Sequence, residues 1–336
     1  MRVGVIGIGY WGPNVLRNFV EVLGQGAVGV CDHNKERLLW AKNLYPDIQL
    51  SEDSDELIHS SAYDIIAICT PLKSHYALAK KALQSKKHVF IEKPFTQTSK
   101  EAQDLITLAE KNGCTVMIDH PQLYSPAFEA IQTIINHKEF GTLYYLDAKR
   151  ANLGRIQPDC NVIWDLAVHD FASLMALISC EAETLAVHSQ YCVPVKLKQD
   201  FAQRASIDIQ YKGNIKASIS LNWVSPIKVR ENVIVSDKKM IHWNELDQKH
   251  PIHYFDSQVH CEDNGATSTI SYHHGKVSYP NLDKHEPLKK QIMHFLNCID
   301  QQKQPFNNHH LGLKVLRFLE ACDQSLQQKG KYIKIR

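Results

Sequence analysis

The sequence predicts an α/β fold with two domains. The first is built on a doubly wound parallel sheet, and the second is an α+β domain on an open, mainly antiparallel sheet. Two patterns predict this: strand-like apolar runs alternate with helical stretches up to about residue 118, and longer runs of alternating polarity follow from about 120. The 336 residues, 44% hydrophobic and 22% charged, suffice for two cores. We place the domains at 1–119 and 120–336.

In the first domain, strands and helices take turns along the chain. Strands are expected at 2–6, 27–31, 64–69, 87–91 and 115–118, and helices at 13–23, 34–43, 53–59, 74–85 and 99–112. This alternation indicates a parallel sheet, and ligands of such sheets bind beyond the carboxyl ends of the strands. The polar segments Thr70-Pro71 and Glu92-Lys93-Pro94 directly follow two of the strands. We therefore expect both segments at the ligand-binding edge.

The second domain shows the period of half-buried strands. In the segment 214–223, apolar residues at 217, 219, 221 and 223 alternate with polar residues. We expect a helix at 126–138, strands at 142–151, 183–193, 203–211, 214–223, 228–236 and 239–243, and a helix at about 164–178 between the first two strands. The polar, His-rich stretch 244–284 is expected to form loops with short strands. Two helices, 286–302 and 308–328, close the chain.

Composition excludes several classes of protein. A net charge of +2 gives no basic surface for nucleic acid or anionic membranes, and no apolar run approaches the roughly 20 residues of a membrane span. The N-terminus has none of the features of a signal peptide. The nine dispersed cysteines lack any CxxC pair, so we expect reduced thiols in a cytoplasmic protein. The eighteen histidines lack metal-ligand spacing in the sequence, and we expect no metal.

A glycine-rich motif follows the first strand. The segment Gly7-Ile8-Gly9-Tyr10-Trp11-Gly12 leads directly into a helix, and Pro13 suits the first turn of that helix. Such a loop permits a tight turn, lets the backbone approach a pyrophosphate and places the phosphates at a helix N-terminus. The motif therefore predicts a dinucleotide site. An ordinary βαβ unit with a glycine turn is the alternative.

The residue that ends the second strand indicates which dinucleotide is bound. Asp32 lies 25 positions after Gly7, where an acidic side chain can accept hydrogen bonds from the adenosine ribose hydroxyls. The same carboxylate would repel a 2′-phosphate. We therefore predict NAD as the cofactor, with NADP less favoured. The nearby Lys35 and Arg37 keep NADP open.

Two polar clusters are candidates for catalysis. Lys93 precedes a proline, which restricts its backbone to extended geometry, yet a solvated loop lysine is the commoner case. Asp165 and His169 are four residues apart and would share one face of a helix. A histidine suits removal of a hydroxyl proton near neutral pH, and a carboxylate could orient its ring. From the spacing alone, structural capping or pairing is the favoured interpretation of this pair.

These segments together resemble the Gfo/Idh/MocA family of oxidoreductases. The resemblance rests on Gly7-Ile8-Gly9-Tyr10-Trp11-Gly12-Pro13-Asn14, on Thr70-Pro71 with His75, on Glu92-Lys93-Pro94 and on Asp165-Leu166-Ala167-Val168-His169-Asp170. It implies a Rossmann domain and NAD(P)-dependent oxidoreduction of CH–OH groups in sugars or polyols. It also implies that Lys93 and His169 flank the reacting carbon and that Asp165 binds a neighbouring hydroxyl. Thr70, Pro71, His75 and Glu92 would line the nicotinamide side, and homodimers or homotetramers are implied.

A narrower resemblance is to members that act on nucleotide-linked sugars in surface-polysaccharide or antibiotic-sugar pathways. It rests on Gly9–Asn14, Arg150-Ala151-Asn152-Leu153-Gly154, Val162–Leu166 and Ser225–Arg230. It implies chemistry at C3 of a UDP- or dTDP-hexose, with Tyr124, Arg150, Asn152, Lys228 and Arg230 as possible substrate contacts. Each of these five, taken singly, is better explained by a structural role.

The chain departs from this group at two places. Val168 stands where relatives often have proline, and the turn at 236–240 lacks glycines.

The alternatives to oxidation of a UDP-sugar are reduction of a 3-keto dTDP-sugar, oxidation of a polyol such as inositol, and a non-catalytic NAD(H)-binding sensor or partner protein.

Overall fold

The computed structural model describes residues 1–335 apart from 155, 157–159, 195–200 and 264–267. The chain divides into two compact units. The first comprises 1–124 and 285–317, and the second comprises 125–284 and 318–336. No helix in the described ranges has the length and apolar character needed to cross a membrane.

The first unit contains a six-stranded parallel sheet with the order β3-β2-β1-β4-β5-β6. Its strands are β1 (Val3–Ile6), β2 (Val28–Cys31), β3 (Gln49–Ser51), β4 (Ile65–Ile68), β5 (His88–Ile91) and β6 (Val116–Ile118). Its helices are α1 (Gly12–Leu23), α2 (Lys35–Leu44), α3 (Ser54–His59), α4 (His75–Gln84), α5 (Ser99–Asn112) and α8 (Pro287–Asp300). The predicted doubly wound parallel sheet is confirmed. Its strand order reverses between β1 and β4, the usual ligand position in this architecture.

Local sequence explains where the elements of this sheet begin and end. Strands β1 and β4 are buried along their whole length, which fits their uninterrupted apolar sequences. Helix α5 begins with a capping box between Thr98 and Glu101 and ends at Gly113, whose φ of 66° is left-handed. Such signals are local, so the boundaries could be predicted closely.

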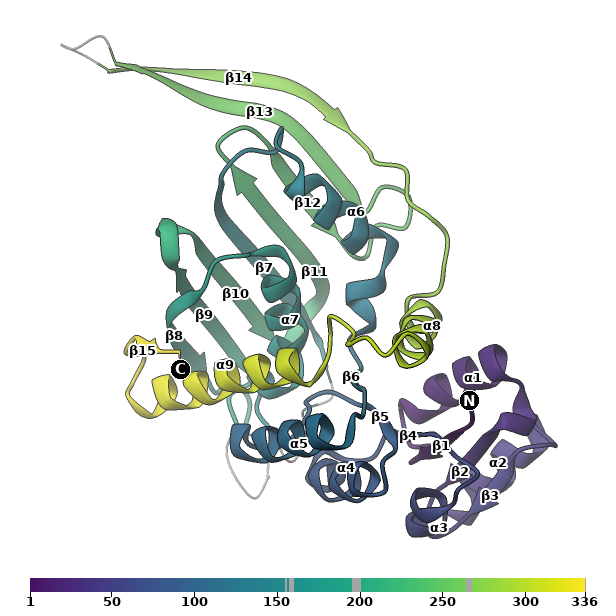
Figure 1. Cartoon of the computed structure of the whole chain (residues 1–336). Helices are drawn as coiled ribbons and strands as arrows, with labels where there is room; N and C mark the ends of the chain where they lie inside the picture. The colour runs from purple at the N-terminus through teal and green to yellow at the C-terminus, as the bar shows by residue number, and fades with distance from the viewer. Residues whose placement is uncertain (155, 157–159, 195–200, 264–267, 336) are drawn as a thin grey trace. The chain divides into compact units, whose positions relative to one another are not determined.

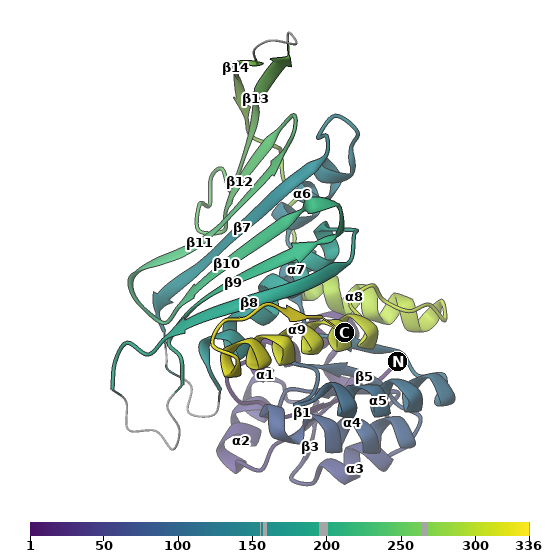
Figure 2. The same cartoon turned by 90° about the vertical axis from the view of Figure 1, so that its left-hand side faces the viewer.

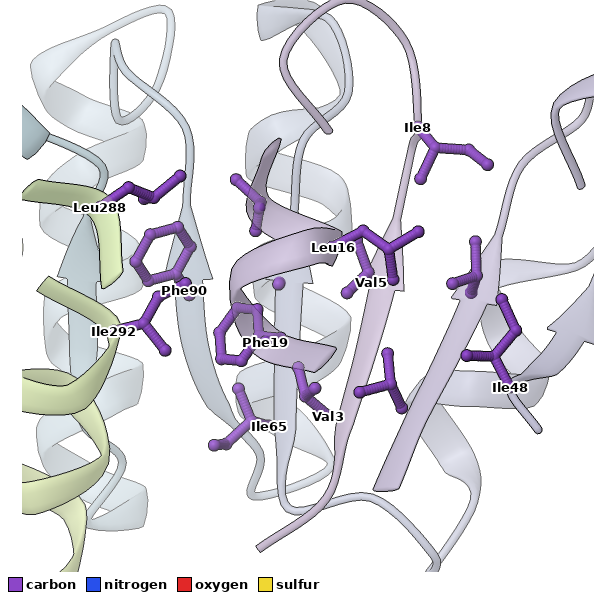
Figure 3. Close-up of a cluster of buried hydrophobic side chains, with 14 of the residues drawn as sticks. Val3, Val5, Ile8, Leu16, Phe19, Ile48, Ile65, Phe90, Leu288 and Ile292 are labelled. Atoms are coloured by element: carbon purple, nitrogen blue, oxygen red, sulfur yellow. The ribbon is translucent and has the colours of Figure 1, made fainter. Parts of the chain in front are cut away.

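Helix α8 packs into the core of the first unit, although it lies far along the chain from the other helices and strands of that core. Phe90 on β5 packs between Phe19 of α1 and Phe295 of α8, with ring centroids 5.7 and 5.9 Å apart. Figure 3 shows Leu288 and Ile292 beside Phe90. The predicted division at 119/120 is therefore wrong for 285–317. The apolar face of a helix does not reveal which of two cores it joins.

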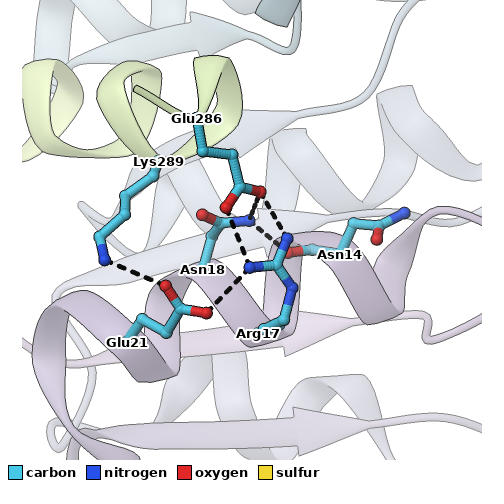
Figure 4. Close-up of polar contacts among 6 residues, drawn as sticks. All are labelled: Asn14, Arg17, Asn18, Glu21, Glu286 and Lys289. Atoms are coloured by element: carbon cyan, nitrogen blue, oxygen red, sulfur yellow. Dashed lines mark hydrogen bonds and ion pairs between the residues drawn. The ribbon is translucent and has the colours of Figure 1, made fainter. Parts of the chain in front are cut away.

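Polar contacts also join α1 to α8. Arg17 pairs with Glu286, and Asn18 donates to the same carboxylate at 2.9 Å (Figure 4). Arg17 also pairs with Glu21 at 2.8 Å, and Lys289 reaches Glu21 at 3.0 Å. These half-exposed pairs add little stability singly, but together they set the register of the two helices.

The second unit contains a nine-stranded sheet with the order β14-β13-β12-β11-β7-β10-β9-β8-β15. Its strands are β7 (Leu143–Leu153), β8 (Ala182–Gln190), β9 (Arg204–Tyr211), β10 (Lys216–Asn222), β11 (Val224–Ser236), β12 (Met240–Asn244), β13 (Ile252–Asp263), β14 (Ser268–Ser278) and β15 (Ile333–Lys334). Strands β7 and β10 are parallel, and the other neighbours pair antiparallel. The predicted open, mainly antiparallel sheet is confirmed.

Helices cover one face of this sheet. They are α6 (Pro126–Asn136), α7 (Val168–Leu177) and the part of α9 (His309–Gln327) from Phe318 onward. Figures 1 and 2 show α6 and α7 on the same side of the strands. Phe128 of α6 packs near Trp243 of β12, and Phe171 of α7 packs on Phe318. The candidate site residues of this unit, Asp165 and His169, lie where α7 begins.

The stretch 244–284 differs from its prediction. It was expected to form loops with short strands, but β13 and β14 are 12 and 11 residues long and form a hairpin. Apolar side chains on it are exposed, with Val259 at 62% and Tyr272 at 68%. Exposed strand segments of this kind lack the polar–apolar alternation that marks a half-buried strand in a sequence.

Candidate functional site

The glycine-rich loop of the first unit has the geometry of a phosphate cradle. Gly7 has a φ of 89°, and a Cβ at Gly12 would overlap the carbonyl oxygen of Gly7. At Gly9, by contrast, a Cβ would meet only the Arg37 guanidinium, at 3.7 Å. Helix α1 follows with no acidic residue in its first turn. The loop therefore leaves open backbone at Gly9, which fits a dinucleotide pyrophosphate held at a helix N-terminus.

The two glycines predict different results for the same substitution. Gly12→Ala is expected to lower the melting temperature, because the new methyl group collides with backbone that cannot move aside. Gly9→Ala is expected to leave the melting temperature nearly unchanged and to weaken NADH binding about tenfold or more, since the methyl group occupies space intended for phosphate. Thermal unfolding and NADH fluorescence titration measure the two effects. Equal loss of stability in both variants would contradict this assignment.

Asp32 directly follows β2 and is only 9% exposed. Its Oδ2 accepts from the Ile8 backbone N–H at 2.8 Å, and its Oδ1 accepts from the Asn34 N–H at 2.8 Å. Arg37 Nη1 lies 3.5 Å from Oδ2. Each carboxylate oxygen can accept a second hydrogen bond, so the arrangement is compatible with the predicted ribose contact.

Segments after β4 and β5 are joined by His75. Its Nδ1 lies 2.9 Å from the Pro94 carbonyl oxygen, and its Nε2 lies 2.9 Å from that of Thr70. Burial lowers the pKa of His75 overall, and the hydrogen bonds to the backbone carbonyls oppose this shift only in part. The Ser74 hydroxyl also donates to Thr70 Oγ1 at 2.7 Å. The imidazole therefore positions the loops that carry Thr70, Pro71 and Lys93. A direct nicotinamide contact from His75 stays a prediction.

A buried carboxyl pair lies beside Lys93. Glu92 and Asp119 directly follow β5 and β6, and their carboxyl groups are within hydrogen-bonding reach of each other. Burial raises the pKa of both, and the charge of Asp119 raises that of Glu92 further. The Trp11 indole N–H donates to Asp119 Oδ2 at 2.7 Å. Burial also lowers the pKa of His120 to about 3, with the Lys93 charge acting in the same direction.

Sequence reasoning missed Asp119 and His120. Both are buried and directly follow the apolar strand β6. The rule that picked out Glu92 and Lys93, namely polar residues immediately after a buried strand, would have found them. The carboxyl ends of β1, β2, β4, β5 and β6 thus bring together the glycine loop, Asp32, Thr70, Lys93 and Asp119.

In the second unit, Asp165 and His169 lie where α7 begins. Residues Ile163–Ala167 form a π-helical turn that continues into α7, and such turns are frequent at functional sites. The predicted helix is confirmed, but its first turn has this wider winding. Trp223, which directly follows β10, donates its indole N–H to Asp165 Oδ2 at 3.0 Å. Asp165 and His169 are both half-buried. Trp223 therefore fixes the position of the Asp165 carboxylate, and both Asp165 and His169 keep part of their surface exposed.

Arg150 forms ion pairs with Asp170 and Glu245 in a largely buried network next to this turn. Its Nε and Nη2 donate to Asp170, at 3.2 and 3.0 Å for Oδ1, and Nη2 donates to Glu245 at 3.1 Å. Arg150 is 6% exposed. Arg230, its register partner on β11, is half-buried, and burial and the Arg150 charge lower its pKa. The geometry favours a positioning role for Arg150, which anchors the residue after His169.

The remaining predicted substrate contacts differ in their surroundings. The Tyr124 hydroxyl donates to Asn307 Oδ1 at 2.6 Å and lies 2.8 Å from His294 Nδ1, which favours a structural role. Asn152 is half-buried, and Lys228 is exposed. Arg230 and Asp165 are close enough for their charges to interact. Substrate contacts by these residues stay predictions.

One described set of residues could in principle hold a metal. Ligand atoms of Glu110, His309 and His310 lie within 4.8 Å of one another. The two histidines open α9, where the positive end of the helix dipole disfavours a cation, and Glu110 and His310 are exposed. The expectation of no metal stays a prediction.

Comparison with known proteins gives a consistent result. Residues 1–120 match the GFO_IDH_MocA model, described as an oxidoreductase family with an NAD-binding Rossmann fold. The UDP-N-acetylglucosamine 3-dehydrogenase of Acidithiobacillus ferrooxidans is 27% identical over 319 residues, which are 94% of each chain. Its crystal structure superimposes with a TM-score of 0.80 at 25% identity, covering 97% of this chain and 99% of that one.

A more distant structure shares the fold. An oxidoreductase from Agrobacterium radiobacter, solved in complex with NAD⁺, L-tartaric acid and magnesium, has a TM-score of 0.82 at 16% identity. The match covers 100% of this chain and 98% of that chain.

Proposed function

Because residues 1–120 match the NAD-binding Rossmann model of the Gfo/Idh/MocA oxidoreductases, we propose that the chain acts as an oxidoreductase of this family and oxidises the C3 hydroxyl of a UDP-linked sugar with NAD. The observation that carries the substrate class is the likeness to a UDP-N-acetylglucosamine 3-dehydrogenase over 94% of both chains. The open backbone at Gly9 and the carboxylate of Asp32 support NAD as the cofactor.

The residues of the first unit would hold the cofactor. The loop from Gly7 to Gly12 would bind the pyrophosphate and Asp32 the adenosine ribose, while Thr70, Pro71 and Glu92 would line the nicotinamide side. Bound NAD supplies a hydride acceptor. His75 keeps the loops after β4 and β5 at a fixed spacing through its two carbonyl contacts.

Two side chains would handle the hydroxyl group. Oxidation of a secondary alcohol removes a hydride from carbon and a proton from oxygen, so a base is required. His169 would take the proton, Asp165 would bind a neighbouring hydroxyl in the orientation that Trp223 imposes, and Lys93 would bind the reacting oxygen. In the reductive direction the same groups would return the proton.

The product would be a 3-keto sugar, which an aminotransferase could consume. We propose that this step belongs to surface-polysaccharide sugar biosynthesis in the cytoplasm and that the enzyme is a homodimer or homotetramer.

Asp32→Ala is expected to weaken NAD binding about 10- to 100-fold and to reduce discrimination against NADP. The substitution removes a charged acceptor for ribose hydroxyls and the repulsion of a 2′-phosphate, and it leaves Arg37 to attract that phosphate. Fluorescence titrations with NADH and NADPH measure both effects. Arg37→Ala is the matched control and should lower NADPH affinity only. An unchanged NADH/NADPH ratio in Asp32→Ala would contradict the role of Asp32.

The proposal is tested by NADH absorbance. Purified protein is mixed with NAD, or separately with NADP, and offered UDP-N-acetylhexosamines, their uronic acids, dTDP-hexoses and inositols. Formation of NADH with a UDP-sugar, and product analysis showing a ketone at C3, is the expected result. Turnover with inositol alone would support a polyol dehydrogenase. Silence with every substrate, combined with measurable NADH binding and no reduction of 3-keto sugars, would support the non-catalytic alternative.

A further inference from the structure

We propose that Glu92 and Asp119 share one proton and act together as a positioning pair for Lys93, linked to the glycine-rich loop through Trp11. This inference rests on the proposed function for its catalytic consequence. The pair and its partners all lie in the first unit.

The hydrogen bonds of the two carboxyl groups are complementary. Glu92 Oε2 accepts from the Lys93 backbone N–H at 3.2 Å, and Asp119 Oδ2 accepts from the Trp11 indole at 2.7 Å. The second oxygen of each group, Glu92 Oε1 and Asp119 Oδ1, is buried without a donor among the described residues. Since the two groups are within hydrogen-bonding reach, one proton between them would satisfy both oxygens.

The surroundings favour one negative charge over two. Burial raises the pKa of each carboxyl, and two adjacent carboxylates in one buried place repel each other. Burial also raises the pKa of the Cys69 thiol and lowers that of His120, so both neighbours stay neutral near pH 7. Gln291 of α8 faces Asp119 and is uncharged. The singly charged pair therefore balances the Lys93 ammonium.

The pair joins the two parts of the predicted cofactor site. Trp11 lies between Gly9 and Gly12, and Lys93 follows Glu92 directly. Contacts run from Trp11 to Asp119, from Asp119 to Glu92, and from Glu92 to the Lys93 backbone. Above the raised pKa of the pair the shared proton is lost, and a second buried charge appears beside Lys93. Activity should therefore change as the pH rises through this raised pKa.

Infrared spectroscopy in D₂O tests the shared proton without substrate. The wild-type protein at neutral pH should show the C=O stretch of one more protonated carboxyl group than either Asp119→Asn or Glu92→Gln. Each variant removes one carboxyl group. The remaining carboxyl group is expected to accept a hydrogen bond from the new amide N–H and to ionise, because the Lys93 charge lowers its pKa. Asp104→Asn is the control, because Asp104 is exposed and its contacts with Lys80 and Tyr76 lower its pKa. A protonated-carboxyl band unchanged in both folded pair variants would overturn the proposal.

The pH profile of kcat/KM tests the positioning role. In Asp119→Asn the limb of the profile that reports this shared proton should move by about one pH unit or more, which is a tenfold change in proton affinity. It should stay in place in Asp104→Asn. An unmoved limb in a folded Asp119→Asn enzyme would overturn the role for Lys93. Failure of the proposed function would appear as silence in the sugar panel, whereas the infrared result would be unaffected.

Discussion

Replacing His169 by alanine is expected to lower kcat by about 10²- to 10⁴-fold, the usual contribution of a positioned general base. The alanine variant has no group at this position that can accept the hydroxyl proton. NADH binding should be nearly unchanged, because the glycine loop and Asp32 belong to the first unit and His169 to the second. Steady-state kinetics and an NADH titration measure the two quantities.

Two further variants separate catalysis from folding. His137→Ala removes an exposed histidine of the same unit and should leave kcat unchanged. Asp165→Asn keeps an oxygen that accepts from the Trp223 indole N–H, so the melting temperature should stay unchanged. The substitution removes the negative charge, so activity should fall. If His169→Ala turns over at the wild-type rate, His169 is not the base.

Arg150→Met should have the largest effect on stability. Asp170 is buried and receives two guanidinium nitrogens, so the substitution leaves an uncompensated carboxyl group in the interior. Breaking a buried pair in this way costs about 3–5 kcal/mol in the free energy of unfolding. Urea denaturation measures this cost.

A double variant distinguishes structure from substrate binding. In Arg150→Met with Asp170→Leu the buried carboxylate of Asp170 is gone, and only the partly exposed Glu245 loses a partner. Stability should therefore largely return, since a buried ion pair is often replaceable by apolar residues. If Arg150 instead contacts substrate, Arg150→Met should keep its stability and raise KM. That result would contradict the positioning role that its contacts with Asp170 and Glu245 indicate.

Several features could be predicted from the sequence because their signals are local. The glycine loop, the buried strands and their following polar residues are each encoded within a few positions, so the parallel sheet and the carboxyl-edge location of Lys93 could be predicted. The hairpin β13–β14 could not, because exposed strands carry no apolar alternation. Asp119 could have been found by the rule that identified Glu92.

The sequence by itself determined the class of fold, the dinucleotide loop and the residues proposed for chemistry, since each depends on short-range spacing. Only the tertiary structure decided that α8 joins the core around Phe90, that Arg150 anchors Asp170, and that Asp119 meets Glu92 and Trp11. These contacts join residues from 20 to more than 200 positions apart. The physical reason is that such contacts depend on which surfaces are buried together, and spacing along the chain does not encode that choice.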